Sequence, residues 1–339
     1  MVARLSLIAL VIPSLLAAQE ESPPLFTSAE TLHLTLVADF NDIHKDRKED
    51  SEYEPAELFF GAAGDDAEGL AVKVKTRGRF RLQRSTCKYP PLRINLPEKK
   101  VEGTVFEGQD RLKLVTHCQD RDSYERNLVE EYLVYRIYNL LSDISFRVRL
   151  ARITYVDARG KDDPVVRYGF LIEDEDAMAA RLGGTLVEAP SASPYDYDDE
   201  GAALVTVFQY MVGNTDFSLV YFHNVKLFRS ADYTYFPIAY DFDWSGFVDA
   251  PYARPDPMLA IRSVRQRVYR GFCRPDVDFS TIFAIFAERR AAIDEMLAAQ
   301  EGLDQRSRDR LTDYLDGFFE TIGKRREADR EIIGACRRI

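Results

Sequence analysis

Two strand-like runs near residue 230 constrain most strongly what this chain can fold into. Residues 225–228 (VKLF) and 233–240 (YTYFPIAY) are separated by a short polar stretch, a pattern typical of a β-hairpin. A turn centred near residue 232 makes the numbers of paired residues add up to about 464, which places Asn224 opposite Tyr240 and beside Asp241. Because antiparallel neighbours lie roughly 5 Å apart, the Asn224 amide and the Asp241 carboxylate can bind one cation.

Oxygen ligands of this kind suit Mg²⁺ or Mn²⁺. Asp243 can reach the same side if the chain stays extended, so the predicted metal ligands are Asn224, Asp241 and Asp243. Asp216 precedes the hairpin in a loop, and a carboxylate there could accept a proton from an attacking hydroxyl group. Asp216 is therefore the predicted catalytic base.

A structural role is the alternative for each of these residues. Asp and Asn are common turn and cap residues, so one of them alone would indicate little. Their order around a hairpin favours a functional site. We interpret His223 as a hydrogen-bonded structural histidine rather than a metal ligand or a general base.

The wider chain changes from β-rich to helical. Hydrophobic periodicity predicts strands in the first half and one long helix, Tyr124 to Leu141. The predicted strands are Thr31–Phe40, Leu70–Thr76, Leu92–Leu96, Arg111–Val115, Arg152–Val156 and Arg167–Ile172. Asn41 to Glu54 is predicted as a loop, and the later helices as Ala202–Met211, Phe279–Gln300 and Gln305–Ile333. This order predicts an α+β fold with two lobes, 19–182 β-rich and 183–339 mainly helical.

The first residues predict export. Arg4 precedes an apolar run from Leu5 to Leu16, followed by Ala17 and Ala18 and then polar residues. The run is about a dozen residues long, shorter than the roughly 20 that span a bilayer. We therefore expect a signal peptide at 1–18, with a buried core helix as the alternative, and no later membrane span.

Cysteine usage agrees with export. The chain has four cysteines, an even number, without a C-x-x-C pair. Three pairings are possible, and we favour Cys87–Cys118 and Cys273–Cys336 because each pair lies within one half of the chain. Disulfides persist in oxidising compartments, so a periplasmic or extracellular location is predicted.

Charge limits the partners. A formal net charge of −11 argues against nucleic-acid binding, which needs a basic surface. Residues 251–274 form a basic segment in this acidic chain, with six arginines and one acid, Asp256. A solvated helix face is the favoured interpretation of this segment, and a site for an acidic substrate or phosphate is the alternative. The oligomeric state is not predicted.

Three motifs contain the predicted site residues: GNTDFS (213–218), HNVKLF (223–228) and YDFDWSG (240–246). They resemble the CotH kinase-like family, a branch of atypical secretory kinases, with weaker support from RGRFR (77–81), DRLKL (110–114) and YERNLVEEYLVYRIY (124–138). The resemblance covers roughly residues 70 to 250. It implies a two-lobed kinase-like fold with Asp216 as the base and Asn224 and Asp241 as metal ligands.

The same resemblance implies a nucleotide site. Lys113 would contact the phosphates, and Glu131 would orient that lysine, with Glu130 as the competing choice. Arg77, Gly78 and Arg79 would cover the phosphates. The chain departs from the usual pattern: Asn224 follows Asp216 by eight positions rather than roughly five, no GxGxxG loop is present, and Asp-Phe-Asp replaces Asp-Phe-Gly.

The sequence predicts an exported phosphotransferase that uses ATP with Mg²⁺ or Mn²⁺ and a protein or small-molecule hydroxyl acceptor. Nucleotidyl transfer is a variant of this function. A non-catalytic module that binds a partner at the cell envelope or spore surface is the main alternative. A structural envelope protein that binds Ca²⁺ is the third. No G-x-S-x-G or H-E-x-x-H signature supports a serine hydrolase or a zinc protease.

Overall fold

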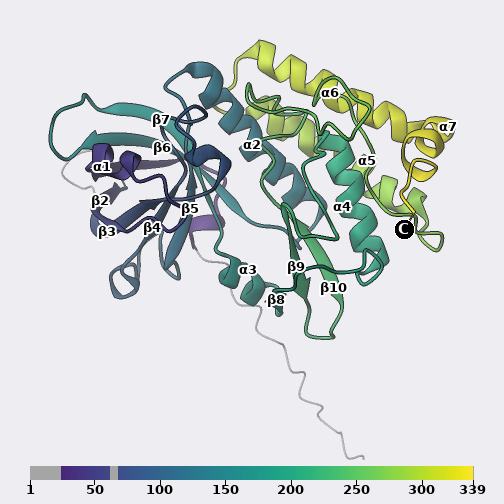
Figure 1. Cartoon of the computed structure of the whole chain (residues 1–339), viewed down its shortest axis with the longest axis horizontal. Coiled ribbons are helices and arrows are strands. Elements are labelled where there is room, and N and C mark those ends of the chain that lie inside the picture. The colour runs from purple at the N-terminus through teal and green to yellow at the C-terminus, as the bar shows by residue number, and fades with distance from the viewer. Residues whose placement is uncertain (1–23, 62–67, 339) are drawn as a thin grey trace, which may run out of the picture.

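The strands of the first half close into a barrel (Figure 1). The computed structural model describes residues 24–61 and 68–338, so the predicted signal peptide at 1–18 lies outside the described residues. Within these ranges, seven strands form a closed barrel in the order β1-β2-β3-β4-β5-β7-β6. Their bounds are β1 Leu32–Ala38, β2 Glu54–Phe60, β3 Glu68–Thr76, β4 Leu92–Asn95, β5 Arg111–Val115, β6 Val148–Asp157 and β7 Val165–Ile172.

The pairing of β1 closes the barrel. This strand is antiparallel to β2 on one side and parallel to β6 on the other, with Leu34 facing Phe60 and Ile153. Alternate β1 side chains, Leu34, Leu36 and Ala38, are buried in the barrel core, as the period of two in a strand requires. Within the described residues, closure leaves the barrel without an unpaired edge strand.

The two-lobed kinase-like fold predicted from the sequence is therefore wrong. Local periodicity identifies strands, but it does not show that β1 pairs with β6, more than a hundred residues later. The strand β2 was also missed, and the predicted loop Asn41–Glu54 contains a short helix, α1 (Phe40–Lys45). The boundary proposed between residues 182 and 183 stays a prediction.

The helices lie beside the barrel (Figure 1). Their bounds are α2 Asp122–Leu141, α3 Glu175–Arg181, α4 Asp199–Val212, α5 Phe279–Ala299, α6 Gln305–Gly323 and α7 Arg325–Ala328. Short turns of helix occur at Pro24–Phe26, Phe80–Leu82 (η2), Glu98–Lys100 and Asp329–Ile333. The predicted helix Gln305–Ile333 is interrupted at Lys324, whose backbone is extended (φ −117°, ψ 103°).

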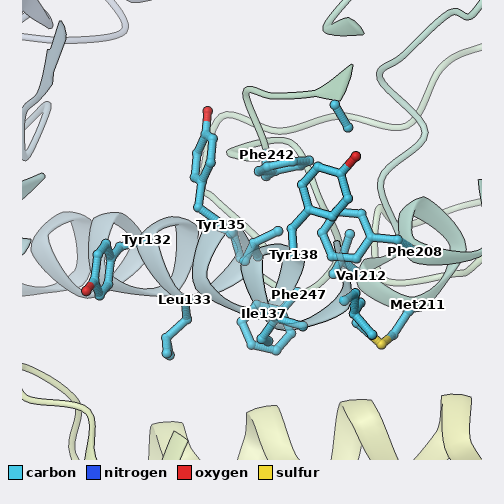
Figure 2. Packing of buried hydrophobic residues seen from close by; sticks show 14 of the residues in the cluster. Tyr132, Leu133, Tyr135, Ile137, Tyr138, Phe208, Met211, Val212, Phe242 and Phe247 are labelled. Carbon is cyan, nitrogen blue, oxygen red and sulfur yellow. The ribbon is translucent and has the colours of Figure 1, made fainter. Parts of the chain in front are cut away.

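Helix α2 packs in a hydrophobic core that it shares with the barrel strands β6 and β7 and with the later helices. Its buried side chains belong to one hydrophobic cluster with residues of α4, α5 and α6. Figure 2 shows Phe242 against Tyr135 and Tyr138 of α2, close to Phe208 of α4. The ring centroid of Phe242 lies 4.7 Å from that of Tyr135 and 5.5 Å from that of Phe208.

The predicted hairpin is present. Strands β9 (Val225–Arg229) and β10 (Tyr235–Ala239) pair antiparallel, with Val225 opposite Ala239 and Arg229 opposite Tyr235. Both pairs satisfy the predicted sum of 464. The Tyr240 N–H donates to the Asn224 carbonyl over 3.1 Å, which confirms the predicted opposition. A short strand, β8 (Thr185–Val187), completes this sheet.

The four cysteines pair as predicted, Cys87 with Cys118 and Cys273 with Cys336. The first bridge joins the loop before β4 to the end of β5, and the second ties the C-terminus to the segment before α5. Both bridges are compatible with an exported protein. None of the helices in residues 24–61 and 68–338 is long and apolar enough to cross a membrane.

The arginine-rich segment 251–274 is not the solvated helix face predicted from the sequence. It is irregular, and several of its arginines donate to backbone carbonyls of the helical part. Arg267 donates to the Met211 carbonyl over 3.0 Å, Arg270 to the Thr215 carbonyl, and Arg274 pairs with Asp199. These guanidinium groups hold the segment in place.

A buried histidine beside the first disulfide predicts acid sensitivity. His117 is 1% exposed, and neither ring nitrogen has a hydrogen-bond partner among the described residues. Burial, with Arg167 adding to it, lowers its pKa from 6.5 to about 4. Between these pH values the unfolded chain binds a proton that the folded chain does not, so stability falls as the pH drops through this window.

Because the unfolded chain protonates His117 more readily, we expect the free energy of unfolding to be about 2 kcal/mol lower at pH 5 than at pH 7. Urea unfolding at both pH values measures this loss. In His117→Phe, which keeps a ring but cannot titrate, the loss should shrink by that amount. Equal losses in the variant and the parent protein would contradict the assignment.

Candidate active site

All nine residues predicted to form the site line one cavity of about 570 Å³. Its walls come from the loop after β3, from β5 and α2, and from the two segments that flank the β9–β10 hairpin. The predicted residues are Arg77, Gly78, Arg79, Lys113, Glu131, Asp216, Asn224, Asp241 and Asp243. The fold thus gathers side chains that are up to 166 positions apart in the chain.

One end of the cavity holds a cluster of carboxylates. Glu131, Asp241 and Asp243 each offer one oxygen, and these oxygens lie within 4.8 Å of one another. The Glu131 side chain comes from α2, whereas the two aspartates follow β10. Glu131 was predicted to orient a lysine, so its place in this carboxylate cluster differs from the role assigned to it.

Arg81 lies among these carboxylates. Its Nη2 is 3.1 Å from Glu131 Oε2 and 3.2 Å from Asp241 Oδ1, and its Nε is 3.0 Å from Asp243 Oδ2. Sequence reasoning missed this role, although Arg81 stands in the RGRFR motif. The run of cations was visible, but only the η2 turn determines which of them points at the acids.

The cluster holds three acidic groups around the single guanidinium of Arg81. Burial raises the pKa of Glu131 and of Asp243; Arg81 opposes this rise, and the neighbouring carboxylates add to it. Burial alone would lower the pKa of Arg81, but Asp243 and Glu131 raise it well above its usual value. The three acids therefore resist ionising together beside one guanidinium, and a divalent cation among them would favour their ionised forms.

The backbone holds Asp241 and Asn224 in a restricted conformation. Asp241 has φ 62° and Asn224 has φ 50°, in the left-handed region that Asp and Asn tolerate better than most residues. The Asp241 N–H donates to the Tyr135 hydroxyl over 2.8 Å. Phe242 lies between Asp241 and Asp243 in the sequence, and its side chain is fully buried. It therefore anchors both aspartates to the helical core.

The Asp216 carboxylate forms its hydrogen bonds with His223 and Asn224. Its Oδ1 is 2.9 Å from His223 Nε2, and its Oδ2 accepts from the Asn224 amide over 3.1 Å. The same amide donates to the Asp216 carbonyl over 2.8 Å. Asn224 therefore bridges the predicted base and the hairpin, and its Oδ1 accepts no hydrogen bond from the residues that the structure describes.

Lys113 has a different partner from the one predicted. It forms an ion pair with Glu175 at the start of α3, and neither Glu131 nor Glu130 contacts it; Glu130 pairs with Arg310. Lys226 binds the same Glu175 at 2.8 Å. Burial would raise the pKa of Glu175, but Lys113 and Lys226 lower it to about 2.

Arg77 supplies an uncompensated cation. Its guanidinium makes no hydrogen bond or ion pair within the described part of the chain, although it lines the cavity and is half-buried. Burial lowers its pKa, and the charge of Asp241 is the largest influence that opposes this shift. The neighbouring Gly78 has φ 97°, a conformation that favours glycine, and Arg79 pairs with Glu49 at 3.2 Å.

The cavity thus combines a carboxylate cluster with cationic side chains and aromatic walls. Carboxylates bind a divalent metal ion, guanidinium and ammonium groups bind phosphate, and aromatic side chains offer flat apolar surfaces to a ring. The aromatic lining residues are Phe80, Tyr135, Phe146, Phe222, Tyr240 and Trp244.

Comparisons with known proteins leave the family open. Each motif that resembles the CotH kinase-like family contributes at least one side chain to the cavity. Membership of that family stays a prediction. No protein-family model matches the chain, and no curated protein is significantly similar to it.

Proposed function

We propose that this chain is an exported phosphotransferase that uses ATP with Mg²⁺ or Mn²⁺. The observation that carries the proposal is the placement of the uncompensated Arg77 in the same cavity as the carboxylates of Glu131, Asp241 and Asp243. A metal–triphosphate complex has the complementary pair of charges. The acceptor is a hydroxyl group of a protein or a small molecule.

The metal–nucleotide complex supplies the phosphoryl group and neutralises its charge when bound. Asp241 and Asp243 bind the metal, with the Asn224 Oδ1 as a further ligand. Arg77, Arg79 and Lys113 hold the phosphates. Glu175 orients Lys113 through their ion pair, which is the role that the family resemblance implied for Glu131.

Asp216 acts as the base in this proposal. The acceptor oxygen forms a bond to the γ-phosphorus, the bond between that phosphorus and the β–γ bridging oxygen breaks, and the hydroxyl proton passes to Asp216. His223 and Asn224 hold the Asp216 carboxylate in one orientation. Positioning and charge neutralisation supply most of the catalysis in such reactions.

The motifs that resemble the CotH kinase-like family support these roles. The resemblance is proposed for the site and not for the architecture, because the barrel differs from the fold that the family implies. The apolar run at residues 5–16 and the two disulfides support export.

Arg81 favours a second candidate function. Its guanidinium lies where a metal ion would neutralise the carboxylates, so metal binding requires Arg81 to release some of its ion pairs. If Arg81 keeps them, the cavity serves a non-catalytic module that binds an anionic partner through Arg77 and Arg79.

Binding of a nucleotide and a metal separates the two candidates. We expect ATP to raise the melting temperature only when Mg²⁺ or Mn²⁺ is present, because a ligand of the folded state stabilises it. Fluorescence should change in parallel, since the chain's single tryptophan, Trp244, lines the cavity. Asp241→Asn should lose both responses, and Asp313→Asn, an exposed change on α6, should keep them. No response to any nucleotide with either metal would exclude the phosphotransferase.

A further inference from the structure

A second cavity, of about 470 Å³, lies at the end of the barrel beside α1. Its walls come from α1, the loop before β4, the end of β5 and the β6–β7 turn. It shares none of its described lining residues with the first cavity. Its volume is within the range of small-molecule sites.

Aromatic rings form a closed cycle in the wall of this second cavity. The cycle runs through Phe40, His44, Tyr89, His117 and Tyr155, and neighbouring ring centroids are 4.6 to 5.6 Å apart. All of these residues line the cavity. Burial lowers the pKa of His44 to about 3 and of His117 to about 4, so the cycle is uncharged at neutral pH. Faces of aromatic rings attract cations, and cages of such rings bind quaternary ammonium groups.

One segment of the wall is acidic. Asp157 ends β6, Asp162 and Asp163 follow in the β6–β7 turn, and all three line the cavity. Asp157 Oδ2 accepts from the Lys161 N–H over 2.8 Å, whereas its buried Oδ1 has no partner among the described residues. Asp163 makes no ion pair within residues 24–61 and 68–338. These carboxylates favour a positively charged ligand group beside the aromatic cycle.

Another segment of the wall is basic. Arg84 and Lys88 lie in the loop before β4 and form no ion pair in the described chain. Lys88 Nζ is 4.9 Å from the Tyr89 ring centroid, and Arg84 donates to the Lys45 carbonyl over 3.4 Å. A ligand that fills this cavity therefore meets acidic groups from one segment and basic groups from another.

We propose that the second cavity binds a small zwitterion that joins a methylated ammonium group to an anionic group, as betaines and phosphocholine do. The ammonium group lies within the aromatic cycle near Asp157, and the anionic group lies near Arg84 and Lys88. Methylation fits the aromatic wall, because an unmethylated ammonium group has three N–H donors that need acceptors. The same headgroup occurs free and on lipids.

Calorimetric titration with glycine betaine and with phosphocholine tests the charge. The control ligand is 3,3-dimethylbutanoate, which has the shape of glycine betaine with carbon in place of the charged nitrogen. We expect glycine betaine to bind at least about 10-fold more tightly, the factor that a cation–π interaction of about 1.4 kcal/mol gives. Equal affinity for both ligands, or no binding of any of them, would refute the proposal. Sedimentation with phosphatidylcholine vesicles distinguishes a lipid headgroup from a free solute as the source.

Variants locate the bound ligand. Tyr89→Leu and Asp157→Asn should each weaken glycine betaine binding about 10-fold. Lys88→Gln, an exposed change that spares the fold, should weaken phosphocholine binding. Tyr233→Leu, at the exposed hairpin turn, is the matched control and should bind like the parent protein. Binding unchanged in all three cavity variants would contradict the site. Trp244 fluorescence should stay constant, which separates this site from the nucleotide cavity.

Discussion

Replacing Asp216 by Asn is expected to lower phosphoryl transfer by a factor on the order of 10² to 10⁴, the usual contribution of a general base. The side chain keeps its size, but it can no longer take the proton of the acceptor. Binding of ATP with the metal should remain, because Asp216 is outside the carboxylate cluster that offers oxygens to a cation. Formation of ADP measures transfer, with water or hydroxyl groups of the protein itself as acceptor.

The matched comparison is Asp241→Asn, which should lose both transfer and the thermal response to the metal–nucleotide complex. Loss of both properties in Asp216→Asn would move Asp216 into the metal site and contradict its role as base. Unchanged transfer in Asp216→Asn would remove it from the chemistry altogether.

Phe242→Ala is expected to lower the free energy of unfolding by about 3–5 kcal/mol, the usual cost of removing a buried ring. The ring packs between α2 and α4 against Tyr135, Tyr138 and Phe208 (Figure 2). It also stands between Asp241 and Asp243 in the chain, so its loss should release both carboxylates. Urea unfolding measures the stability, and the thermal response to ATP with Mn²⁺ measures the site.

Phe247→Ala is the matched control, because Phe247 is equally buried in the same hydrophobic cluster and carries no neighbouring site carboxylate. Both variants should lose similar stability, but only Phe242→Ala should lose metal–nucleotide binding. Phe242→Leu keeps most of the packing and serves if the alanine variant does not fold. Equal binding in the two alanine variants would show that Phe242 does not position the aspartates.

The sequence predicts those parts of the site that depend on local chain geometry. The hairpin register follows from the two strand runs and the short turn, and it correctly places Asn224 opposite Tyr240. The disulfide pairing follows from the division of the chain into halves. Residues close in the sequence determine the hairpin register, whereas the paired cysteines are 31 and 63 positions apart and share only the same half of the chain.

Long-range pairing determines the parts that the sequence does not predict. Lys113 reaches Glu175 because β5 pairs with β7, which places Lys113 opposite Ile172, three residues before that glutamate. No local pattern shows this register. The barrel likewise depends on the parallel pairing of β1 with β6. The sequence gives no local sign of this pairing, so we predicted a two-lobed fold instead of a barrel.

The loop from Arg77 to Tyr89 lines the first cavity with its first residues and the second cavity with its last. Its far end is tied to β5 by the bridge between Cys87 and Cys118. In a reducing cytoplasm this bridge does not form, and the loop that carries Arg77 and Arg81 has no covalent anchor. Reduction of this one bridge is therefore expected to loosen a wall of both cavities at the same time.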